Sequence, residues 1–178
     1  EARRANRLYG LPLVWKRIVE VDLSRWDLSS LVQLDSGTSA TPIELLRQMR
    51  SSFPEAKIRI YYGSTEVGSA TALADADGLR KPGSVGLAPV NVDVRRAEGG
   101  EMCVRSALLM DAYFDDPETT AASFDDGWFR MGDIGSVDEE GYFSIVGRKK
   151  EILRTGGESV SPNEVEGVLR GAPGVDEV

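Results

Sequence analysis

The sequence predicts an α/β fold in which part of a parallel-sheet α/β subdomain is followed by a small antiparallel β-barrel subdomain and the start of a C-terminal α+β domain. Three observations support this prediction. Two strand-like runs flank one helical segment early in the chain, alternating residues with turn signals fill its middle, and a glycine pair precedes a helix start near its end. These changes place the expected boundaries at residues 1–80, 81–149 and 150–178.

The first part contains a strand–helix–strand unit. Branched and aromatic residues gather at residues 31–34 and 58–61, which predicts two strands. Between them, Thr41 is expected to cap a helix, with Pro42 at the first helical position and Glu44 completing a capping box. Open α/β sheets bind ligands where their parallel strands end, so the loops that follow the two strands are expected to lie side by side around one cleft.

Two antiparallel hairpins are expected in the middle part. The first pairs the alternating valines of residues 90–94 with residues 101–105 across a glycine turn, and it places Cys103 in a strand. The second spans residues 135–146, with a turn near its centre. A short helix is expected to begin at Asp116, between the hairpins.

The last part begins beyond a basic stretch and opens with the pair Gly156-Gly157. A second capping box at residues 161–164 predicts a helix that reaches Arg170. Residues 175–178 are typical of the start of a strand with no partner after it. We therefore expect the chain to stop within this domain.

The composition restricts the class of function. With 178 residues and 41% hydrophobic content the chain can form a core, and its net charge of −8 argues against nucleic acid as the main partner. No apolar run approaches the roughly 20 residues needed to cross a membrane, and residues 1–7 lack the apolar stretch of a signal peptide. The sole cysteine, Cys103, excludes an intrachain disulfide and fits a reducing compartment. We expect a cytoplasmic protein.

Histidine is absent, so any chemistry has to use carboxylates, amines, hydroxyls and the backbone. After the second strand, Gly63 permits a tight turn, where the hydroxyls of Ser64 and Thr65 can bond phosphate oxygens. Glu66 offers a hard oxygen ligand suited to Mg²⁺, and Tyr62 could stack on a purine. The alternative is a strand-ending turn with a solvated glutamate.

Two charged residues further along could bind a nucleotide. Asp133 follows a glycine, and a carboxylate exposed at a turn there could accept both hydroxyls of a ribose, although aspartate after glycine is also common in ordinary turns. Arg148 could hold a ribose or an α-phosphate through its planar fork of donors, or it could form the basic edge of a loop.

Six stretches of the sequence form an ordered set of motifs. They are residues 35–40 (DSGTSA), 62–66 (YGSTE), 82–86 (PGSVG), 100–113, 128–133 (WFRMGD), and 147–150 (GRKK) with 156–158 (GGE). In this order and spacing, from Leu8 to Val178, the chain resembles the acyl-adenylate-forming (AMP-binding) superfamily of acyl-CoA synthetases, luciferases and peptide-synthetase adenylation domains.

The resemblance implies that three residues, Gly37, Thr38 and Ser39, line the adenine side of the nucleotide site. It also implies that Tyr62 stacks on the base and that Thr65 contacts the phosphate of the acyl-adenylate. Gly63 and Ser64 belong to the same expected nucleotide-binding loop.

Further roles follow from the resemblance for the charged residues. Glu66 matches the Mg²⁺ ligand, Asp133 the aspartate that holds the ribose hydroxyls, and Arg148 the arginine near it. Lys150 matches the hinge about which a small C-terminal domain swings between adenylation and thioester formation. The residues expected to take part in catalysis are therefore Thr65, Glu66, Arg148 and the hinge Lys150.

The pair Gly156 and Gly157 resembles the version found in CoA ligases, where glycine leaves room for the pantetheine arm. Residues 11–15 resemble a helix near the carboxylic-acid pocket of the family, and an amphipathic core helix is an equally good interpretation. Where the family usually has Gly-Gly-Ala, this chain has Gly37-Thr38-Ser39, and Met131 stands where threonine is usual.

The family's upstream Ser/Thr/Gly-rich phosphate loop and its adenylation lysine near the C-terminus are missing from the sequence, so the chain alone is expected to be nearly inactive. The resemblance implies a fragment of an acid–thiol ligase that uses ATP, Mg²⁺ and coenzyme A to activate a carboxylic acid, fatty or related, and transfer it to CoA. An acyl-AMP ligase that loads a carrier protein, an amino-acid adenylation domain and a non-catalytic nucleotide-binding module are the alternatives.

Overall fold

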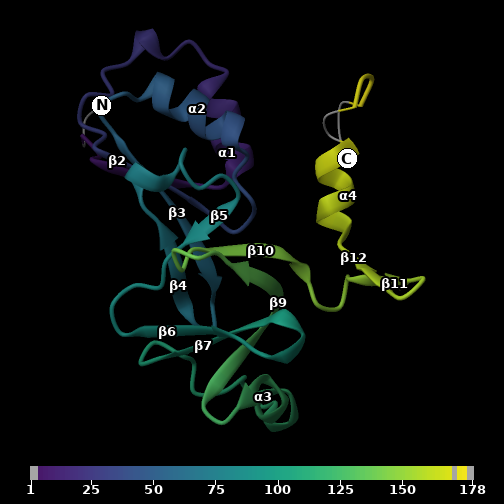
Figure 1. Ribbon diagram of the computed structural model, residues 1–178. Helices are drawn as coiled ribbons and strands as arrows, with labels where there is room; N and C mark the ends of the chain where they lie inside the picture. The colour runs from purple at the N-terminus through teal and green to yellow at the C-terminus, as the bar shows by residue number, and fades with distance from the viewer. Residues whose placement is uncertain (1–3, 170–171, 176–178) are drawn as a thin grey trace.

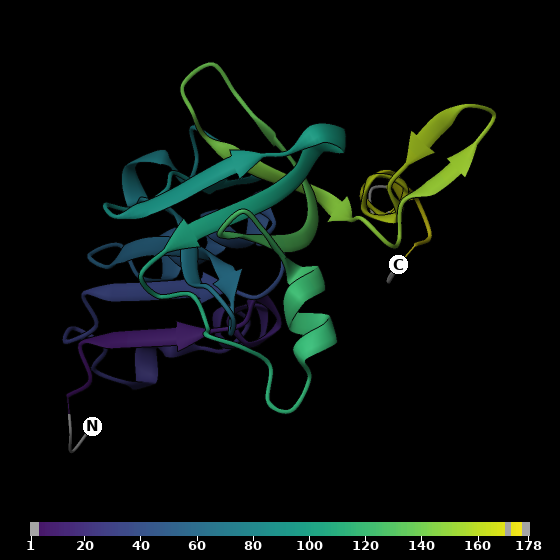
Figure 2. The same ribbon diagram turned by 90° about the horizontal axis from the view of Figure 1, so that it is seen from below.

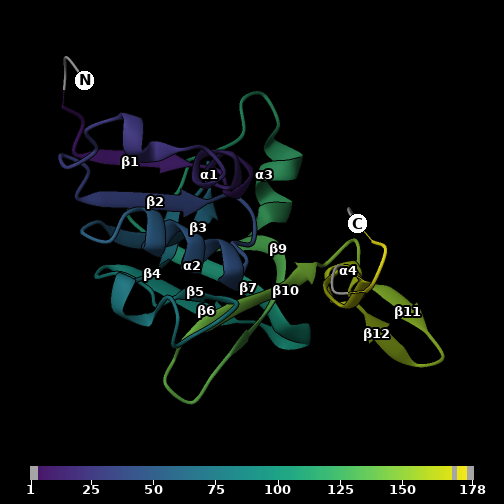
Figure 3. The ribbon, with the colours of Figure 1, turned by 90° about the horizontal axis from the view of Figure 1, so that it is seen from above.

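The computed structural model describes residues 4–169 and 172–175, and two sheets form its body (Figure 1). Sheet A has the strand order β1-β2-β3-β4, which Figure 3 shows side by side. In that order the strands are Arg7–Gly10, Gln33–Gly37, Lys57–Ser64 and Gly68–Leu73. The first three run parallel, and β4 returns antiparallel to β3. The predicted strand–helix–strand unit is confirmed, with β1 and β4 as additions to it.

Helices α1 (Pro12–Val19) and α2 (Ile43–Ser52) pack with sheet A around one apolar core. Trp15 of α1 is fully buried, donates its Nε1–H to the Asp35 carbonyl at 3.0 Å, and meets Phe53 edge to face with ring centroids 6.2 Å apart. This burial supports the core-helix interpretation of residues 11–15. From α2 the core receives Leu45, Leu46 and Met49, one helical turn of apolar side chains.

The predicted capping box at the start of α2 is wrong. The cap position is Pro42, and no side chain caps the helix there. Thr41 is instead buried, with its hydroxyl 3.0 Å from the Ser36 hydroxyl, and Glu44 pairs with Arg47 on the helix surface. The reason is that Ser36 is fully buried in β2 and a buried hydroxyl requires a hydrogen-bond partner. The Thr41 hydroxyl is that partner, and it therefore does not cap the helix.

Sheet B is the predicted antiparallel barrel-like part, and it curves beside sheet A (Figure 2). Its strand order is β5-β10-β9-β7-β6, with β8 pairing β9. In chain order these are Ser84–Gly86, Val92–Arg96, Glu101–Ser106, Phe124–Asp125, Trp128–Val137 and Phe143–Arg148. Both predicted hairpins are present as β6–β7 and β9–β10, although Val90 precedes β6 and is 87% exposed. The predicted fold class is confirmed.

The helix predicted at Asp116 is α3 (Pro117–Ser123). The Asp116 carboxylate accepts a hydrogen bond from the Thr119 amide at 2.9 Å and so caps the helix, as the sequence indicates. Cys103 lies in β7, as predicted, and it is fully buried, which raises the pKa of its thiol.

A short segment joins the two sheets. Thr71 of β4 donates its hydroxyl to the Val85 carbonyl at 2.7 Å, and Ala72 bridges to Leu87 just beyond β5. Gly86 has φ +93°, and a Cβ there would lie 2.0 Å from the Ala72 carbonyl oxygen. Only glycine fits this approach, so the Pro82–Gly86 motif has a packing role at the joint.

A charged cluster also joins residues 77–81 to the turn between β9 and β10. Lys81 pairs with Asp138 at 2.6 Å and with Glu140, while Arg80 pairs with Glu140 at 2.6 Å. Both cations lie over the ring of Tyr142, with Lys81 Nζ 4.8 Å from its centroid. The cluster fixes the hairpin of sheet B against the loop that leaves sheet A.

We expect this cluster to lose its stabilising effect in acid. The pKa values of Asp138 and Glu140 are lowered from their ordinary 3.8 and 4.5, chiefly by hydrogen bonds from Lys81. Carboxyls with lowered pKa values stabilise the folded state fully above those ordinary values; the effect begins to decrease below about pH 4.5 and is lost as pH falls through the lowered pKa values. Urea unfolding between about pH 5 and about pH 3 should therefore show a smaller pH-dependent loss for Lys81→Met than for the unchanged protein or for the exposed control Lys57→Met. An identical loss in all three would contradict this.

The last part of the described chain stands to one side of the sheets (Figure 1). It consists of the hairpin β11 (Leu153–Thr155) and β12 (Glu158–Val160) and the helix α4 (Pro162–Leu169). The Ser161 hydroxyl of the predicted capping box donates to the Val146 carbonyl of β10 at 2.7 Å, and the Asn163 side-chain amide donates to the same oxygen at 3.4 Å. The three expected domain boundaries remain predictions. Arg170 and the strand expected at residues 175–178 lie outside or at the edge of the described residues.

None of the helices in residues 4–169 and 172–175 is long and apolar enough to span a membrane.

Candidate active site

Asp133 is the centre of a polar cluster between the two sheets. It accepts a hydrogen bond from the Tyr62 hydroxyl at 2.6 Å, and its other oxygen lies 3.1 Å from Arg148 Nε. Asp133 and Arg148 are direct partners on β9 and β10. The expectation of a turn at Asp133 is wrong: the residue lies inside β9 with its side chain 8% exposed, because β10 pairs along this stretch. This nearly buried carboxylate is held by Tyr62 and Arg148 and is not an ordinary turn residue.

Arg148 extends from the cluster towards solvent. Its Nη1 donates weakly to the Met131 carbonyl at 3.4 Å, and its side chain is 56% exposed. A guanidinium carries five N–H donors, so this arginine can hold Asp133 and still donate to an anion. Met131, the departure noted in the sequence, packs its own side chain into the core of sheet B and contributes its backbone oxygen here.

Tyr62 connects sheet A to the cluster in sheet B. Burial, and then the hydrogen bond to Asp133, raise the pKa of its hydroxyl, which therefore stays protonated and donates. Its ring packs against the core of sheet B. The predicted stacking of Tyr62 on a purine stays a prediction.

The turn between β3 and β4 carries Glu66. Gly63 allows the turn to close, since a Cβ there would lie 1.9 Å from the Gly68 carbonyl oxygen, and Val67 is fully buried as its anchor. The pKa of the Glu66 carboxyl is lowered by the nearby Ser64 hydroxyl, whose buried oxygen makes no hydrogen bond of normal geometry, and also by the Tyr113 hydroxyl and the charge of Arg148. Glu66 is thus an oriented carboxylate within the electrostatic reach of the Asp133 cluster, on a strand-ending turn as the sequence indicates.

Thr65 of the same turn is exposed, so its hydroxyl is accessible. Nearby, Gly37 ends β2, and Thr38 and Ser39 begin the loop after it. Gly37 pairs with Tyr61 of β3, and a Cβ at Gly37 would lie 2.7 Å from the Tyr61 carbonyl oxygen. The loops after β2 and β3 therefore lie side by side, as expected.

Thr38 adopts a backbone conformation unusual for its type. Its φ is +70°, and its hydroxyl donates to the Gly37 carbonyl at 2.6 Å. A β-branched residue in the left-handed region costs on the order of 1–3 kcal/mol. The backbone of Thr38 is thus strained next to the predicted adenine side of the nucleotide site. Glycine, which adopts this conformation without strain, is the usual residue at this position.

Three predicted site residues lie apart from the cluster. Lys150 is exposed in the turn directly after β10. Gly156 and Gly157 form the tip of the β11–β12 hairpin with φ +58° and +88°, as a two-residue turn with two positive φ angles requires, and a Cβ on either would meet no atom within 4 Å. The structure does not bring this pair to Asp133.

Three residues with a bearing on the site lie in the motif stretches 100–113 and 147–150 but have no role assigned from the sequence. Tyr113 donates its hydroxyl to Glu66 Oε1 at 3.0 Å, and Lys149 Nζ lies 2.6 Å from Glu101 Oε2, a carboxylate only 7% exposed. The Lys149 amide also donates to the Gly132 carbonyl at 2.8 Å. The two contacts of Lys149 fix the residue directly after Arg148. In each of these contacts, and in that of Tyr113 with Glu66, the two partners are far apart in the sequence, so no local sequence pattern reveals them.

Replacing Lys149 with methionine is expected to lower the free energy of unfolding by about 1–3 kcal/mol, because Glu101 would stay nearly buried without its partner. Urea denaturation measures this. Lys150→Met is the matched control, since that lysine is adjacent and exposed. Adding Glu101→Gln to Lys149→Met should recover part of the loss, and equal stability of Lys149→Met and the control would refute the assignment.

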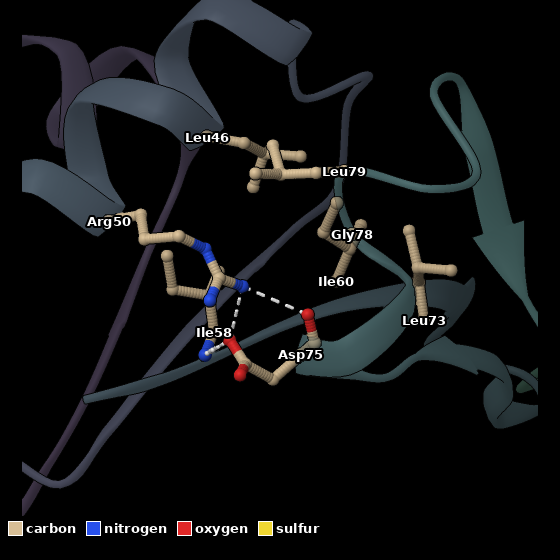
Figure 4. Close-up of a pocket in the computed structure, with 8 residues that line it drawn as sticks. All are labelled: Leu46, Arg50, Ile58, Ile60, Leu73, Asp75, Gly78 and Leu79. Atoms are coloured by element: carbon tan, nitrogen blue, oxygen red, sulfur yellow. Dashed lines mark hydrogen bonds and ion pairs between the residues drawn. The ribbon is translucent and has the colours of Figure 1, made fainter. Parts of the chain in front are cut away.

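Two hollows of the described surface lie elsewhere. The first, of about 10 Å³, lies between α2 and sheet A and has room for at most about one water (Figure 4). Arg50 there donates to the Asp75 carbonyl at 2.9 Å and pairs with its carboxylate at 2.8 Å. The second is an open apolar groove of about 440 Å³ along α1. Neither is lined by the Asp133 cluster.

The residues present fit a magnesium ion bound together with a phosphate ligand. The described residues contain no group of three or more acidic, cysteine or histidine side chains that could hold a metal alone. Mg²⁺ with a nucleotide commonly uses one or two carboxylates, with phosphate oxygens and water as its remaining ligands. A single oriented carboxylate, Glu66, near the exposed Arg148 is compatible with that donor set.

Comparisons with known proteins point to one family. The family described as "AMP-binding enzyme" matches residues 1–114. Long-chain-fatty-acid–CoA ligase FadD13 of Mycobacterium tuberculosis is 43% identical over 145 residues, which are 70% of this chain and 29% of that protein. Indoleacetate–CoA ligase of Aromatoleum aromaticum is 40% identical over 169 residues, which are 86% of this chain and 32% of that protein. The chain thus spans about a third of the length of these curated relatives.

A solved structure shows the same architecture. O-succinylbenzoate coenzyme A synthetase (MenE) from Bacillus subtilis, in complex with ATP and magnesium ion, matches with a TM-score of 0.87 and 25% identity. The match covers 98% of this chain and 38% of that chain.

Proposed function

The chain belongs to the AMP-binding enzyme family, as its motifs predict, and from that premise we propose that it holds the adenylate in a ligase that joins a carboxylic acid to coenzyme A. The observation that carries the proposal is the convergence of Tyr62, Asp133 and Arg148, with Glu66 within reach of the arginine's charge. Residues from both sheets contribute to this one cluster.

The proposed reaction has two steps. The substrate carboxylate attacks the α-phosphorus of ATP, which forms the acyl-adenylate and releases pyrophosphate. The thiol of coenzyme A then attacks the acyl carbon, which forms the thioester and releases AMP. A magnesium ion, when bound, would offset the negative charge of the phosphates.

Each residue of the cluster has a proposed part in the first step. Asp133 accepts the ribose hydroxyls through the lone pairs left beside its contacts with Tyr62 and Arg148, since a carboxylate has about four acceptor sites. Arg148 donates to the ribose or the α-phosphate with its exposed edge, and Glu66 ligates the metal.

The loops after β2 and β3 would bind the rest of the nucleotide. The backbone and hydroxyls of Gly37, Thr38 and Ser39 line the adenine side, and Tyr62 is the proposed stacking partner of the base. The exposed Thr65 hydroxyl contacts the phosphate, together with the Gly63-Ser64 segment of the turn. The adjacency of β2 and β3 supports this arrangement.

The second step is proposed to use the segment after β10. Lys150 is the proposed hinge, supported by its place directly after the anchored Lys149 and before the hairpin that stands aside. Swinging about this point would bring Gly156 and Gly157 towards the adenylate and leave room for the pantetheine arm.

The substrate and location are also proposals. A fatty or related acid and a CoA acceptor are supported by the names of the relatives, which act on long-chain fatty acids and indoleacetate. A cytoplasmic location is proposed because the one cysteine of these 178 residues, Cys103, cannot form a disulfide within them, which fits a reducing compartment. We also propose that the 178 residues alone are nearly inactive, because they lack the family's phosphate loop and adenylation lysine.

The test uses the protein expressed from its complete reading frame. A fatty or aryl acid should stimulate exchange of labelled pyrophosphate into ATP, and added CoA should give a thioester of the expected mass. Exchange without a CoA thioester would favour carrier-protein loading or amino-acid adenylation. ATP binding with no exchange for any acid would favour the non-catalytic module and would refute the ligase proposal.

A further inference from the structure

The loop between β7 and α3 holds Glu66 at two points. The Tyr113 hydroxyl donates to Glu66 Oε1 at 3.0 Å, and the Met110 amide donates to the Glu66 carbonyl at 2.7 Å. One loop of sheet B thus fixes both the side chain and the backbone of a residue on a turn of sheet A. The contact joins residues 47 positions apart.

Tyr113 is itself anchored to the first turn of α3. Its amide donates to the Thr120 hydroxyl at 3.0 Å, and that hydroxyl donates to the Asp116 carbonyl at 2.7 Å. Asp116 also caps α3 through the Thr119 amide. The chain of contacts runs from the capped first turn of α3 through Tyr113 to the Glu66 carboxylate, so the hydroxyl that holds this carboxylate is itself attached to a helix.

We propose that Tyr113 is a positioning residue for Glu66, holding Oε1 so that Oε2 is the oxygen presented to a divalent cation. The inference rests on the proposed function, in which Glu66 is the metal ligand. A carboxylate has acceptor sites to spare, so accepting one hydrogen bond leaves it able to ligate. Residues that orient a metal ligand by hydrogen bonding commonly change metal affinity about 10–100-fold when they are replaced.

The test is Tyr113→Phe, which removes only the hydroxyl, in the protein expressed from its complete reading frame. Binding of Mn²⁺ in the presence of a non-hydrolysable ATP analogue, followed by electron paramagnetic resonance, should weaken by about 10-fold. The metal-free affinity for the analogue should stay the same. In turnover, a higher Mg²⁺ concentration should restore the rate of Tyr113→Phe, since the ligand itself remains.

Phe114→Leu is the matched control, because that neighbour is fully exposed and lies outside the proposed site. Thr120→Val is a second variant that keeps the Tyr113 hydroxyl but removes its anchor, and it should weaken Mn²⁺ binding by less than Tyr113→Phe. Equal Mn²⁺ affinity in Tyr113→Phe and the unchanged protein would overturn the positioning role.

Glu66→Gln separates this inference from the proposed function. If Glu66→Gln weakens Mn²⁺ binding and Tyr113→Phe does not, the positioning role fails and the metal role of Glu66 stands. If Glu66→Gln itself leaves Mn²⁺ binding unchanged, the metal assignment fails, and the role of Tyr113 fails with it. Weakening in both variants, with rescue by Mg²⁺ in Tyr113→Phe alone, is the expected result.

Discussion

Replacing Asp133 with alanine is expected to reduce ATP–pyrophosphate exchange by about 100-fold or more in the protein expressed from its complete reading frame. The proposed hydrogen bonds from two ribose hydroxyls to a charged, nearly buried carboxylate are worth about 1.5–3 kcal/mol each, and about 2.7 kcal/mol corresponds to 100-fold. The change also releases Arg148 and the Tyr62 hydroxyl, which would lose their shared partner. The exchange assay with a saturating acid measures the effect.

Two variants show whether the loss is specific. Asp133→Asn keeps the shape of the side chain but removes its charge. Its exchange rate should lie between those of Asp133→Ala and the unchanged protein. Asp125→Ala removes an exposed carboxylate on β8, paired with Arg130 at 3.2 Å, and it should leave exchange near its starting rate. An unchanged exchange rate in Asp133→Ala would remove the ribose assignment.

Replacing Lys150 with proline is expected to suppress thioester formation by about 100-fold while adenylate formation is retained. Proline fixes its own φ and restricts the residue before it, so it stiffens the turn that has to change if the C-terminal segment swings. The residues proposed to bind the adenylate precede this turn, and two of them, Asp133 and Arg148, are held by the pairing of β9 with β10. Single-turnover measurement of the acyl-adenylate and of the CoA thioester separates the two steps.

Lys150→Ala is the control for Lys150→Pro, since it removes the amine but leaves the backbone free. Thioester formation should be impaired far less in Lys150→Ala than in the proline variant. Equal loss of both half-reactions in Lys150→Pro would argue against a hinge, and a parallel drop in urea stability would indicate that the turn has unfolded.

The elements that depend on local sequence are those that could be predicted. Both hairpins of sheet B follow from period-2 alternation and turn residues, and α3 follows from the cap at Asp116. The order of β2, α2 and β3 was also predictable, because its apolar patterns are strong. That Glu66, Asp133 and Arg148 share one site followed from the motif resemblance and stays a prediction; the structure pairs Asp133 with Arg148 and places Glu66 where the charge of Arg148 acts on it.

What could not be predicted depends on partners distant in the sequence. Gly132-Asp133 has the local chemistry of a turn, yet pairing with β10 makes it part of a long strand. Thr41 has the local chemistry of a helix cap, yet its hydroxyl forms a hydrogen bond with the buried Ser36 hydroxyl. The Tyr113 contact with Glu66 likewise exists only once the sheets have come together. In each case tertiary contacts override local preference.

The Val146 carbonyl accepts two hydrogen bonds from the start of α4, one from Ser161 and one from Asn163. Two such bonds have a combined net value of about 1–3 kcal/mol in water. If the C-terminal segment swings about Lys150 as proposed, it has to break them, and a ligand that favours the swung arrangement by a few kcal/mol more would offset that cost.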